Sequence, residues 1–513
     1  MSHPYAELLD QIRSGQVTNA RQFERAKTRF ARKHAMPKTP KNADILNVLS
    51  DEEYREFAAF LKTKPVRTAS GVANIAVMWL PERPQDSCSS HCIYCPQGTP
   101  RNRAVPKSYT GTEPTTMRAL RNNFDPHRQI ENRLHHFRIL GQPADKCELI
   151  VMGGTFPEWQ LAEQERFIKS CFDAFNGKDS ANLQDAQRLN ETAPHRVVGL
   201  TIETRADWCS DTTINDLLRF GCTRVEIGVQ STSDRILELI KRGHDCKENV
   251  RAIARLKRAG LKVTVHWMPG LTGLYGLDLR EEVELFKQLF TPGYSPDELK
   301  IYPTLVIDGT VLHRLWREGR YTPLTKEQMS SLLFELKRHV PPWVRIKRVM
   351  RDISEREVSA GPRTTNLRQL TKEASVHDQW PCVCIRCREI GLQDCTPERT
   401  ELLVSEYEAS GGKELFISFE DREQRLLLGF CRLRIDAGVA TVRELHVYGT
   451  MARLGEAGIV QHRSLGSQLL EKAETIAQDR GCTCVRVTSG IGVREYYRKR
   501  GYEQRGYYMV KQL

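Results

Sequence analysis

The stretch Ser-Cys-Ser-Ser-His-Cys-Ile-Tyr-Cys-Pro, residues 87–96, decides the fold of this chain. It places Cys88, Cys92 and Cys95 in a Cys-x3-Cys-x2-Cys pattern, in a loop that follows the first strand we expect. Three thiolates at this spacing can hold three irons of a [4Fe–4S] cluster and leave the fourth iron open. The open iron can then chelate S-adenosylmethionine (SAM), whose sulfonium is cleaved by an electron from the cluster. The pattern predicts a radical SAM enzyme.

A zinc knuckle is the alternative interpretation of this motif, with His91 as the fourth ligand. Zinc usually takes its remaining ligand from a second paired element downstream, and no such element is near. The Ile93-Tyr94 pair between the cysteines supplies apolar cover of the kind that shields a cluster from solvent. These features favour iron and sulfur.

Strands and helices are expected to alternate from Val72 onward. The β-rich apolar runs are Val72–Trp79, Glu148–Met152, Val197–Ile202, Arg224–Val229, Lys262–Trp267 and Leu299–Tyr302. Helical periodicity lies between them, at Glu163–Phe175, Ile214–Phe220, Glu248–Ala259 and Leu279–Phe290. Gly221 and Gly260 stand where helix C-caps are expected. This alternation predicts an α/β fold of parallel strands with right-handed crossovers, either an open doubly wound sheet or an incomplete β/α barrel.

Polar residues follow three successive strands, where such folds place their ligands. Gly153-Gly154-Thr155 comes after the strand ending at Met152, Glu203 closes the next strand and Gln230 the one after it. Glycines let the backbone approach a ligand, and the two polar side chains suit ribose or amino-acid contacts. We expect these five residues to contact SAM.

The chain has 513 residues, which predicts two or three domains, and its net charge is +13 with a pI near 9.1. The segment Arg21–Lys41 carries eight Lys or Arg residues against one acid, Glu24, with Phe23 and Phe30 interleaved. Basic side chains neutralise phosphates, while the aromatics either anchor a helix or stack on bases. We therefore expect a nucleic-acid partner. No membrane-spanning run or secretory segment is apparent, so we expect a cytoplasmic, reducing compartment.

A second cysteine cluster, Cys382, Cys384 and Cys387, follows a proline- and arginine-rich stretch from Val340 to Arg368. A tetrahedral zinc would need one more ligand, for which His377 is the first choice and Cys395 the second. Unligated cysteines and a second iron–sulfur cluster are the alternatives.

The chain after Glu401 is expected to form an α+β domain. Strands are expected at Glu414–Phe419, Arg425–Ile435, Val439–Val447 and Cys484–Ser489, with a helix at Ser464–Arg480. The turn Gln461–Gly466 leads into this helix and can seat a pyrophosphate on free N–H groups. Glu444-Leu445-His446-Val447 ends a strand that suits a pantetheine arm, and Tyr497 can donate to a thiolate.

Together these motifs resemble one family, the catalytic subunit of Elongator. The matching segments are Cys-Ile-Tyr-Cys-Pro (92–96), Ser-Tyr-Thr-Gly-Thr-Glu-Pro-Thr (108–115), Met-Gly-Gly-Thr-Phe (152–156), Ile-Glu-Thr-Arg-Ala-Asp (202–207), Glu-Leu-His-Val-Tyr-Gly (444–449) and Tyr-Tyr-Arg-Lys-Arg-Gly-Tyr (496–502). The resemblance covers nearly the whole chain. It implies a basic tRNA-binding segment (1–70), an incomplete radical SAM β/α barrel (71–340), a zinc-bearing linker (341–400) and a GNAT acetyltransferase-like domain (401–513).

The resemblance also implies a reaction in which acetyl-CoA, SAM and the wobble uridine of tRNA give 5-carboxymethyluridine. A 5′-deoxyadenosyl radical would abstract hydrogen from the acetyl methyl group, and the carbon radical would add to carbon 5 of uridine. Water would then release coenzyme A. The acetyl-CoA contacts carried over are Lys146, Glu444, Leu445, His446, Val447, Gln461, His462, Leu465, Gly466, Ser467 and Tyr497. Of these, Lys146, Glu444, His446 and Tyr497 are the candidate catalytic residues.

Two departures from the family pattern affect these expectations. Ser464 replaces the first glycine of the family's Gln-His-x-Gly-x-Gly turn, which would weaken or reshape coenzyme A binding. The spacing between Cys88 and Cys92 is the short radical SAM spacing, where family members commonly have a longer one.

Two other functions are compatible with parts of the sequence. A histone-type lysine acetyltransferase would use Glu444 or His446 as general base, but it leaves the first cysteine motif unexplained. A tRNA-binding scaffold with weakened cofactor sites is the other. The expected partners are the anticodon stem-loop of tRNA and either a second copy or Elongator-type accessory subunits.

Overall fold

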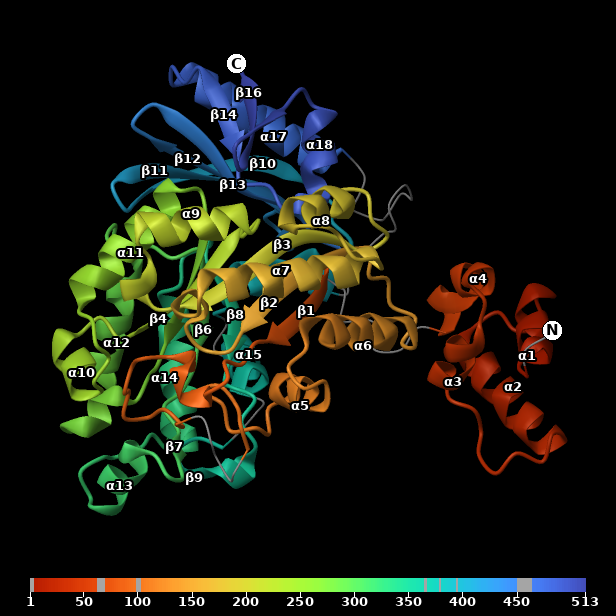
Figure 1. The fold of residues 1–513 in the computed structure, drawn as a ribbon, viewed down its shortest axis with the longest axis horizontal. Coiled ribbons are helices and arrows are strands. Elements are labelled where there is room, and N and C mark those ends of the chain that lie inside the picture. The colour runs from red at the N-terminus through yellow and green to blue at the C-terminus, as the bar shows by residue number, and fades with distance from the viewer. Residues whose placement is uncertain are drawn as a thin grey trace.

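The computed structural model describes residues 4–61, 70–97, 103–363, 367–377, 380–393, 395–449 and 464–513. The N-terminal helices stand to one side of the molecule (Figure 1). They are α1 (Ala6–Arg13), α2 (Ala20–Lys33), α3 (Asn42–Val48) and α4 (Asp51–Leu61). Phe23 and Phe30 are buried in a core formed by these helices. In this structure the two aromatics therefore anchor α2, and the exposed face of the helix is left to Arg and Lys side chains.

A seven-stranded sheet follows, with the order β1-β2-β3-β4-β5-β6-β8, and every pair in it is parallel. Its strands are β1 (Ala73–Met78), β2 (Lys146–Met152), β3 (Arg196–Thr204), β4 (Arg224–Gln230), β5 (Lys262–Trp267), β6 (Glu298–Ile301) and β8 (Arg345–Val349). Consecutive strands are neighbours throughout, which is the order of a half-barrel and excludes the doubly wound sheet. The six expected strands are confirmed. The seventh, β8, lies in the Pro- and Arg-rich stretch where we expected none.

Helices cover the outer side of this sheet (Figure 1). The helices of this region are α5 (Pro114–Arg121), α6 (Pro126–Arg138), α7 (Leu161–Asn176), α8 (Leu183–Asn190), α9 (Asp211–Arg219), α10 (Asp234–Leu239), α11 (Cys246–Arg258), α12 (Leu279–Lys287), α13 (Val311–Arg317), α14 (Lys326–Arg338), α15 (Leu367–His377) and α16 (Ile385–Arg388). A small antiparallel pair joins β7 (Val306–Ile307) to β9 (Val358–Ala360). Gly221 and Gly260 follow α9 and α11 with φ of +84° and +81°, as expected of C-cap glycines.

The C-terminal domain is a second seven-stranded sheet, with the order β10-β11-β12-β13-β14-β16-β15. Its elements are β10 (Glu401–Ala409), β11 (Gly412–Asp421), β12 (Leu426–Asp436), β13 (Val439–Val447), α17 (Leu465–Asp479), β14 (Cys484–Val487), α18 (Arg494–Arg498), β15 (Glu503–Arg505) and β16 (Tyr508–Gln512). The β13–β14 pair is parallel and ends at Val442. The last residues of β13 thus diverge from β14, which leaves the gap that the sequence suggested for a ligand arm.

The two sheets are held together by close backbone packing. Ile491, in a short 3-10 turn after β14, is buried within the core of the half-barrel. A Cβ on Gly490 would lie 2.1 Å from the carbonyl oxygen of Val198 in β3, and one on Gly492 would lie 2.5 Å from Cβ of Arg196. Glycine is therefore required at both positions. None of the described helices has the length and apolar composition needed to cross a bilayer.

Candidate functional site

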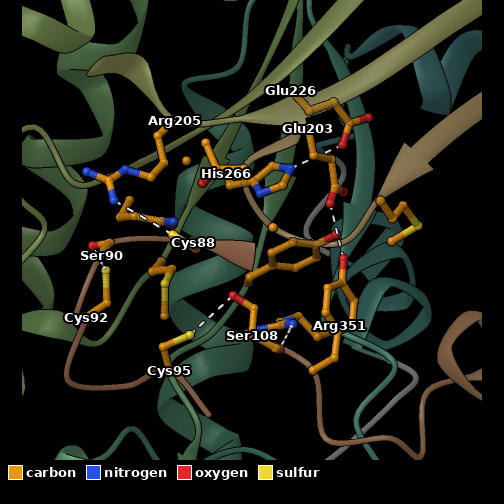
Figure 2. Close-up of a pocket in the computed structure, with 18 of the residues that line it drawn as sticks. Cys88, Ser90, Cys92, Cys95, Ser108, Glu203, Arg205, Glu226, His266 and Arg351 are labelled. Atoms are coloured by element: carbon orange, nitrogen blue, oxygen red, sulfur yellow. Dashed lines mark hydrogen bonds and ion pairs between the residues drawn. The ribbon is translucent and has the colours of Figure 1, made fainter. Parts of the chain in front are cut away.

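The three N-terminal cysteines line one pocket at the carboxyl ends of the barrel strands. Cys88, Cys92 and Cys95 are all free thiols there, and Cys92 and Cys95 are buried. Figure 2 shows the cysteines on one side of the pocket and Glu203, Glu226 and Arg351 on the other. Gly154, Thr155 and Gln230, from our expected SAM contacts, also line it. The loop motif and the strand-end residues thus meet, as the parallel topology requires.

Two arginines contact the thiols. Arg242 Nη1 lies 3.6 Å from Cys92 Sγ, and Arg205 Nη1 lies 3.7 Å from Cys88 Sγ. Burial opposes ionisation of Cys92, but the charge of Arg242 and hydrogen bonds from Ser90 and Arg242 outweigh it and lower the pKa of this thiol. Burial raises the pKa of Cys95 to about 11. The pocket therefore favours a thiolate at Cys92, the form that binds metal.

The backbone after β2 passes closely under the first loop. A Cβ on Gly153, at φ +132°, would lie 2.7 Å from the carbonyl oxygen of Trp79, and one on Gly154 would lie 2.4 Å from that of Ser87. Gln230 has φ +67°, and its buried Oε1 has no hydrogen-bond partner among the described residues. A buried amide oxygen without a partner is costly. A ligand amine or hydroxyl in this pocket would satisfy it, so the residues present fit SAM.

The wall opposite the cysteines is charged and hydrogen-bonded. Tyr109 donates from its hydroxyl to Glu203 Oε2 at 3.1 Å, and Lys300 Nζ lies 3.4 Å from Glu203 Oε1. Lys300 is also ion-paired with Glu226, which lies 3.2 Å from His266 Nε2. The sequence analysis assigned a contact to Glu203 alone. Tyr109 lies in the matching segment 108–115 but received no role, and Glu226, His266 and Lys300 come from separate strands with no local motif.

A second, larger cavity lies between the half-barrel and the C-terminal domain. Of the residues expected to contact acetyl-CoA, it is lined by Lys146, Glu444, Leu445, His446, Val447, Leu465, Gly466, Ser467 and Tyr497. Gln461 and His462 lie outside the described residues. The buried hydroxyl of Tyr496, which the sequence did not single out above Tyr497, also lines the cavity and has no hydrogen-bond partner among the described residues. The α17 N-terminus and this hydroxyl fit a coenzyme A arm.

Glu444 is fully engaged in ion pairs. Its Oε1 lies 3.2 Å from Lys262 Nζ, and its Oε2 accepts from Arg432 Nε at 2.9 Å. Burial works against its charge, but Lys262 and Arg432 outweigh it and lower its pKa. His446 Nε2 donates to the Ser70 carbonyl at 2.9 Å, and burial lowers the pKa of its ring. Glu444 is therefore poorly suited to act as a general base, whereas His446 is neutral.

The two cavities share walls. Thr115, Met152, Glu226 and Arg348 line both of them. The second cavity is lined by the starts of the barrel strands and the cysteine pocket by their ends, so the two cavities adjoin inside the half-barrel at these shared residues. Charged side chains fill this interior, where Lys347 Nζ lies 3.3 Å from Glu226 and 3.4 Å from Glu298. Arg224 lies 3.4 Å from Glu298, so this interior is polar and charge-paired.

The second cysteine cluster is also assembled. The Sγ atoms of Cys382, Cys384 and Cys387 lie within 4.8 Å of one another. The side chain of His377 lies outside the described part of the chain. Cys395 is exposed and does not belong to the group among the described residues. Three converging thiols suit zinc, and the fourth ligand stays a prediction.

Comparisons with known proteins cover the chain from end to end. Four family models match: the ELP3 N-terminal domain (residues 1–69), the radical SAM superfamily (83–286), the radical SAM C-terminal domain (296–375) and the GNAT acetyltransferase family (385–502). A tRNA uridine(34) acetyltransferase of Methanocaldococcus jannaschii is 42% identical, over 99% of this chain and 96% of its own. Human Elongator complex protein 3 is 39% identical, over 96% of this chain and 93% of its own. A solved structure of Methanocaldococcus infernus Elp3 lacking its N-terminus is 40% identical, with a TM-score of 0.76 over 87% of this chain and all of that one.

Proposed function

This chain belongs to the family of the Elongator catalytic subunit and the tRNA uridine(34) acetyltransferases, and we propose that it modifies the wobble uridine of tRNA. The proposed co-substrates are SAM and acetyl-CoA, and the proposed product is 5-carboxymethyluridine. Radical chemistry suits this product because carbon 5 of uracil is not acidic enough for easy polar alkylation.

The observation that carries the proposal is that the two cavities adjoin inside the half-barrel. Thr115, Met152, Glu226 and Arg348 line both, so the route that we propose for an acyl group runs past these side chains, from the C-terminal domain to the cysteine pocket. A conventional acetyltransferase has no need of such a route. The ion pairs on Glu444 further weaken the protein-acetyltransferase alternative, because they remove one of its two candidate bases.

The chain's own residues would hold each co-substrate. Cys88, Cys92 and Cys95 would ligate a [4Fe–4S] cluster, and Gly153–Thr155, Glu203 and Gln230 would position SAM. When bound, cluster and SAM would supply a 5′-deoxyadenosyl radical able to take hydrogen from an acetyl methyl group. Lys146, residues 444–447 and 465–467, and Tyr497 would hold acetyl-CoA. The charge-paired interior would orient its thioester arm and shield it from bulk water.

Further proposals concern partners and organisation. The basic α2 face would contact the phosphates of the anticodon stem-loop, since its Arg and Lys side chains are exposed. Homodimers and Elongator-type accessory subunits are the proposed protein partners. A zinc on Cys382, Cys384 and Cys387 would brace the linker, residues 341–400, between the radical SAM domain (71–340) and the GNAT-like domain (401–513). The described cysteines are all free, which supports a cytoplasmic location.

Anaerobic reconstitution tests the function. The protein is loaded with iron and sulfide and incubated with SAM, acetyl-CoA, dithionite and unmodified tRNA, and the digested nucleosides are separated by mass spectrometry. We expect carboxymethyluridine only when all components are present, and none with Cys92→Ala, which removes a cluster ligand. Cleavage of SAM without a modified nucleoside would contradict the substrate assignment. Intact SAM with a loaded cluster would contradict the radical chemistry.

A further inference from the structure

His266 lies on the wall of the pocket opposite the cysteines, and one of its ring nitrogens is close to a hydrogen-bond acceptor. His266 lies in β5 and lines the pocket, with its side chain 16% exposed. Its Nε2 lies 3.2 Å from Glu226 Oε2. An ionised carboxylate only accepts, so Nε2 carries the ring hydrogen and Nδ1 keeps a lone pair. His266 thus offers an acceptor to whatever enters the pocket.

Nearby cations fix the protonation states of this pair. Lys300 is ion-paired with Glu226, and Lys347 Nζ lies 3.3 Å from its other oxygen, which keeps Glu226 ionised. Burial lowers the pKa of His266, and Lys300 lowers it further. A neutral imidazole with hydrogen on Nε2 is the state that results.

The same cations argue against a metal at this position. Ligand atoms of Glu203, Glu226 and His266 lie within 4.8 Å of one another, a spacing that a divalent ion can bridge. The Lys300 ammonium contacts both carboxylates, however, and supplies the positive charge itself. Lys347 also contacts Glu226, so two cations balance the two carboxylates without a metal.

Aromatic and basic side chains surround His266. Tyr302 packs against it edge-to-face, with ring centroids 5.3 Å apart. The Arg351 guanidinium lies 5.8 Å from the Tyr109 ring centroid and 6.0 Å from that of Tyr302. These residues and Arg348 all line the pocket. Flat rings suit stacking on a base, and the arginines suit its phosphate.

We propose that this wall is the uracil subsite, in which His266 Nδ1 accepts a hydrogen bond from N3–H of the extruded base. The proposal rests on the proposed function and adds to it the residue that selects the base. Cytosine presents a lone pair at N3 where uracil presents N–H, so it would place two acceptors against each other. A site built for one donor rejects the analogue that lacks it, because a buried polar group is left unpaired.

Two substitutions at His266 separate a hydrogen-bonding role from a merely structural one. His266→Phe keeps a ring and removes the acceptor. His266→Asn places an amide near the Nδ1 position, and an amide can turn to accept from uracil or donate to cytosine. His339 caps the C-terminus of α14 and lines neither cavity, so His339→Asn is the matched control.

Competition between two anticodon hairpins that differ only at position 34 tests the proposal. Reconstituted enzyme modifies the uridine hairpin while the cytidine hairpin is added as inhibitor, and binding of both is followed by fluorescence anisotropy. For the wild type and His339→Asn, we expect the inhibition constant of the cytidine hairpin to exceed the dissociation constant of the uridine hairpin by about tenfold or more. Both His266 variants should bring these two constants within about twofold of each other. His266→Asn should do so because the cytidine hairpin binds more tightly, and His266→Phe because the uridine hairpin binds more weakly.

The two levels of failure are distinguishable. If the wild type forms no modified uridine, the proposed function fails, whatever His266 does. If the wild type modifies uridine and both His266 variants still exclude the cytidine hairpin as strongly, the subsite assignment is wrong. A wild type that binds both hairpins equally would also overturn it.

Discussion

Arg443 and Asp297 form a doubly hydrogen-bonded ion pair across the boundary between the two sheets. Arg443 Nη2 lies 2.6 Å from Asp297 Oδ1 and Nη1 lies 2.8 Å from Oδ2, and both side chains are fully buried. Lys257 Nζ lies 3.4 Å from the same carboxylate. Asp297 precedes β6 of the half-barrel and Arg443 lies in β13, so the pair joins the two domains.

Replacing Asp297 by Asn should destabilise the protein by about 3–5 kcal/mol, because the buried cations Arg443 and Lys257 then have, among the described residues, only the carboxylate of Glu414 to share. Chemical denaturation measures this, with Glu406→Gln as the control. Glu406 pairs with Arg480 at the surface, where about 1 kcal/mol or less is expected. Burial opposes the charge of Asp297, but Arg443 and Lys257 hold its pKa well below the usual value of about 3.9. The stability that the Asp297 charge contributes is therefore fully present above about pH 3.9, and it is lost as the pH falls through the pKa of Asp297 in the folded protein. Equal losses in the two variants would contradict the prediction.

Arg242 should support the iron–sulfur cluster through Cys92. Arg242→Met removes the hydrogen bond to the thiolate and, with it, the nearby positive charge, and residues that orient ligands are worth about 10–100-fold in metal affinity. Iron and sulfide per chain after reconstitution, with the charge-transfer absorbance, report the loss. Arg242→Lys keeps the charge and should retain more cluster. Arg235 is an exposed arginine over the Tyr275 ring, and Arg235→Met should bind as much iron and sulfide as the wild type. Full cluster loading of Arg242→Met would refute the role of Arg242.

Ser464 stands at φ +61°, a conformation that costs a non-glycine residue about 1–2 kcal/mol. It precedes α17 and lines the cavity in which we propose that acetyl-CoA binds. Ser464→Gly should bind acetyl-CoA as tightly as the wild type or more tightly, whereas Ser464→Val should bind several-fold more weakly because a β-branched residue disfavours this conformation. Isothermal titration calorimetry distinguishes them. Equal affinities for the two variants would mean that this turn does not shape the site.

Acetyl-CoA binding should weaken as pH rises, through Lys146. Burial lowers the pKa of this lysine, with Asp145 acting in the opposite direction, so its positive charge is lost below the ordinary value of about 10.4. Loss of that charge removes attraction to the phosphates of coenzyme A. Dissociation constants measured between about pH 7 and pH 10 should rise for the wild type and stay flatter for Lys146→Arg, which remains charged. If the dissociation constants of the wild type and Lys146→Arg rise in parallel with pH, Lys146 is not the group whose titration weakens binding.

Purified protein should contain one zinc ion per chain, released by Cys384→Ser. His377→Ala should release it as well, whereas Cys395→Ser should retain it, since Cys395 is exposed and apart from the cluster. Inductively coupled plasma mass spectrometry gives the metal content, and thermal unfolding shows the associated loss of stability. Zinc lost from Cys395→Ser and kept by His377→Ala would reverse the choice of fourth ligand.

Six strands of the half-barrel were predictable because Val, Ile and Leu recur along them between inward charges such as Glu226 and Lys300, or because turn glycines flank them. β8 was missed because Arg345 and Lys347 point into the barrel and the segment reads as a basic linker. Inward charges break the apolar pattern on which strand prediction depends. The sequence did not reveal that the barrel interior is charged, because each ion pair joins strands that are far apart along the chain.

The cysteine motif and the strand-end residues were predictable because each sits at a fixed place in a repeating βα unit. Arg242 and His266 were not, since nothing in their neighbouring residues marks them as lining a pocket. Arg242 reaches Cys92 across 150 positions of sequence. Such pairings are set by tertiary packing alone, and a single sequence carries no local signal for them.

The burial of Ile491 in the half-barrel bears on how the chain is made. Domains generally fold in order as they leave the ribosome, the N-terminal one first. Here the core of the first sheet receives a side chain from position 491 of 513, together with the glycine contacts at Gly490 and Gly492. During translation part of the core of the half-barrel therefore stays open until residue 491 has been synthesised. A nascent chain stalled within the C-terminal domain would expose that gap to chaperones and proteases.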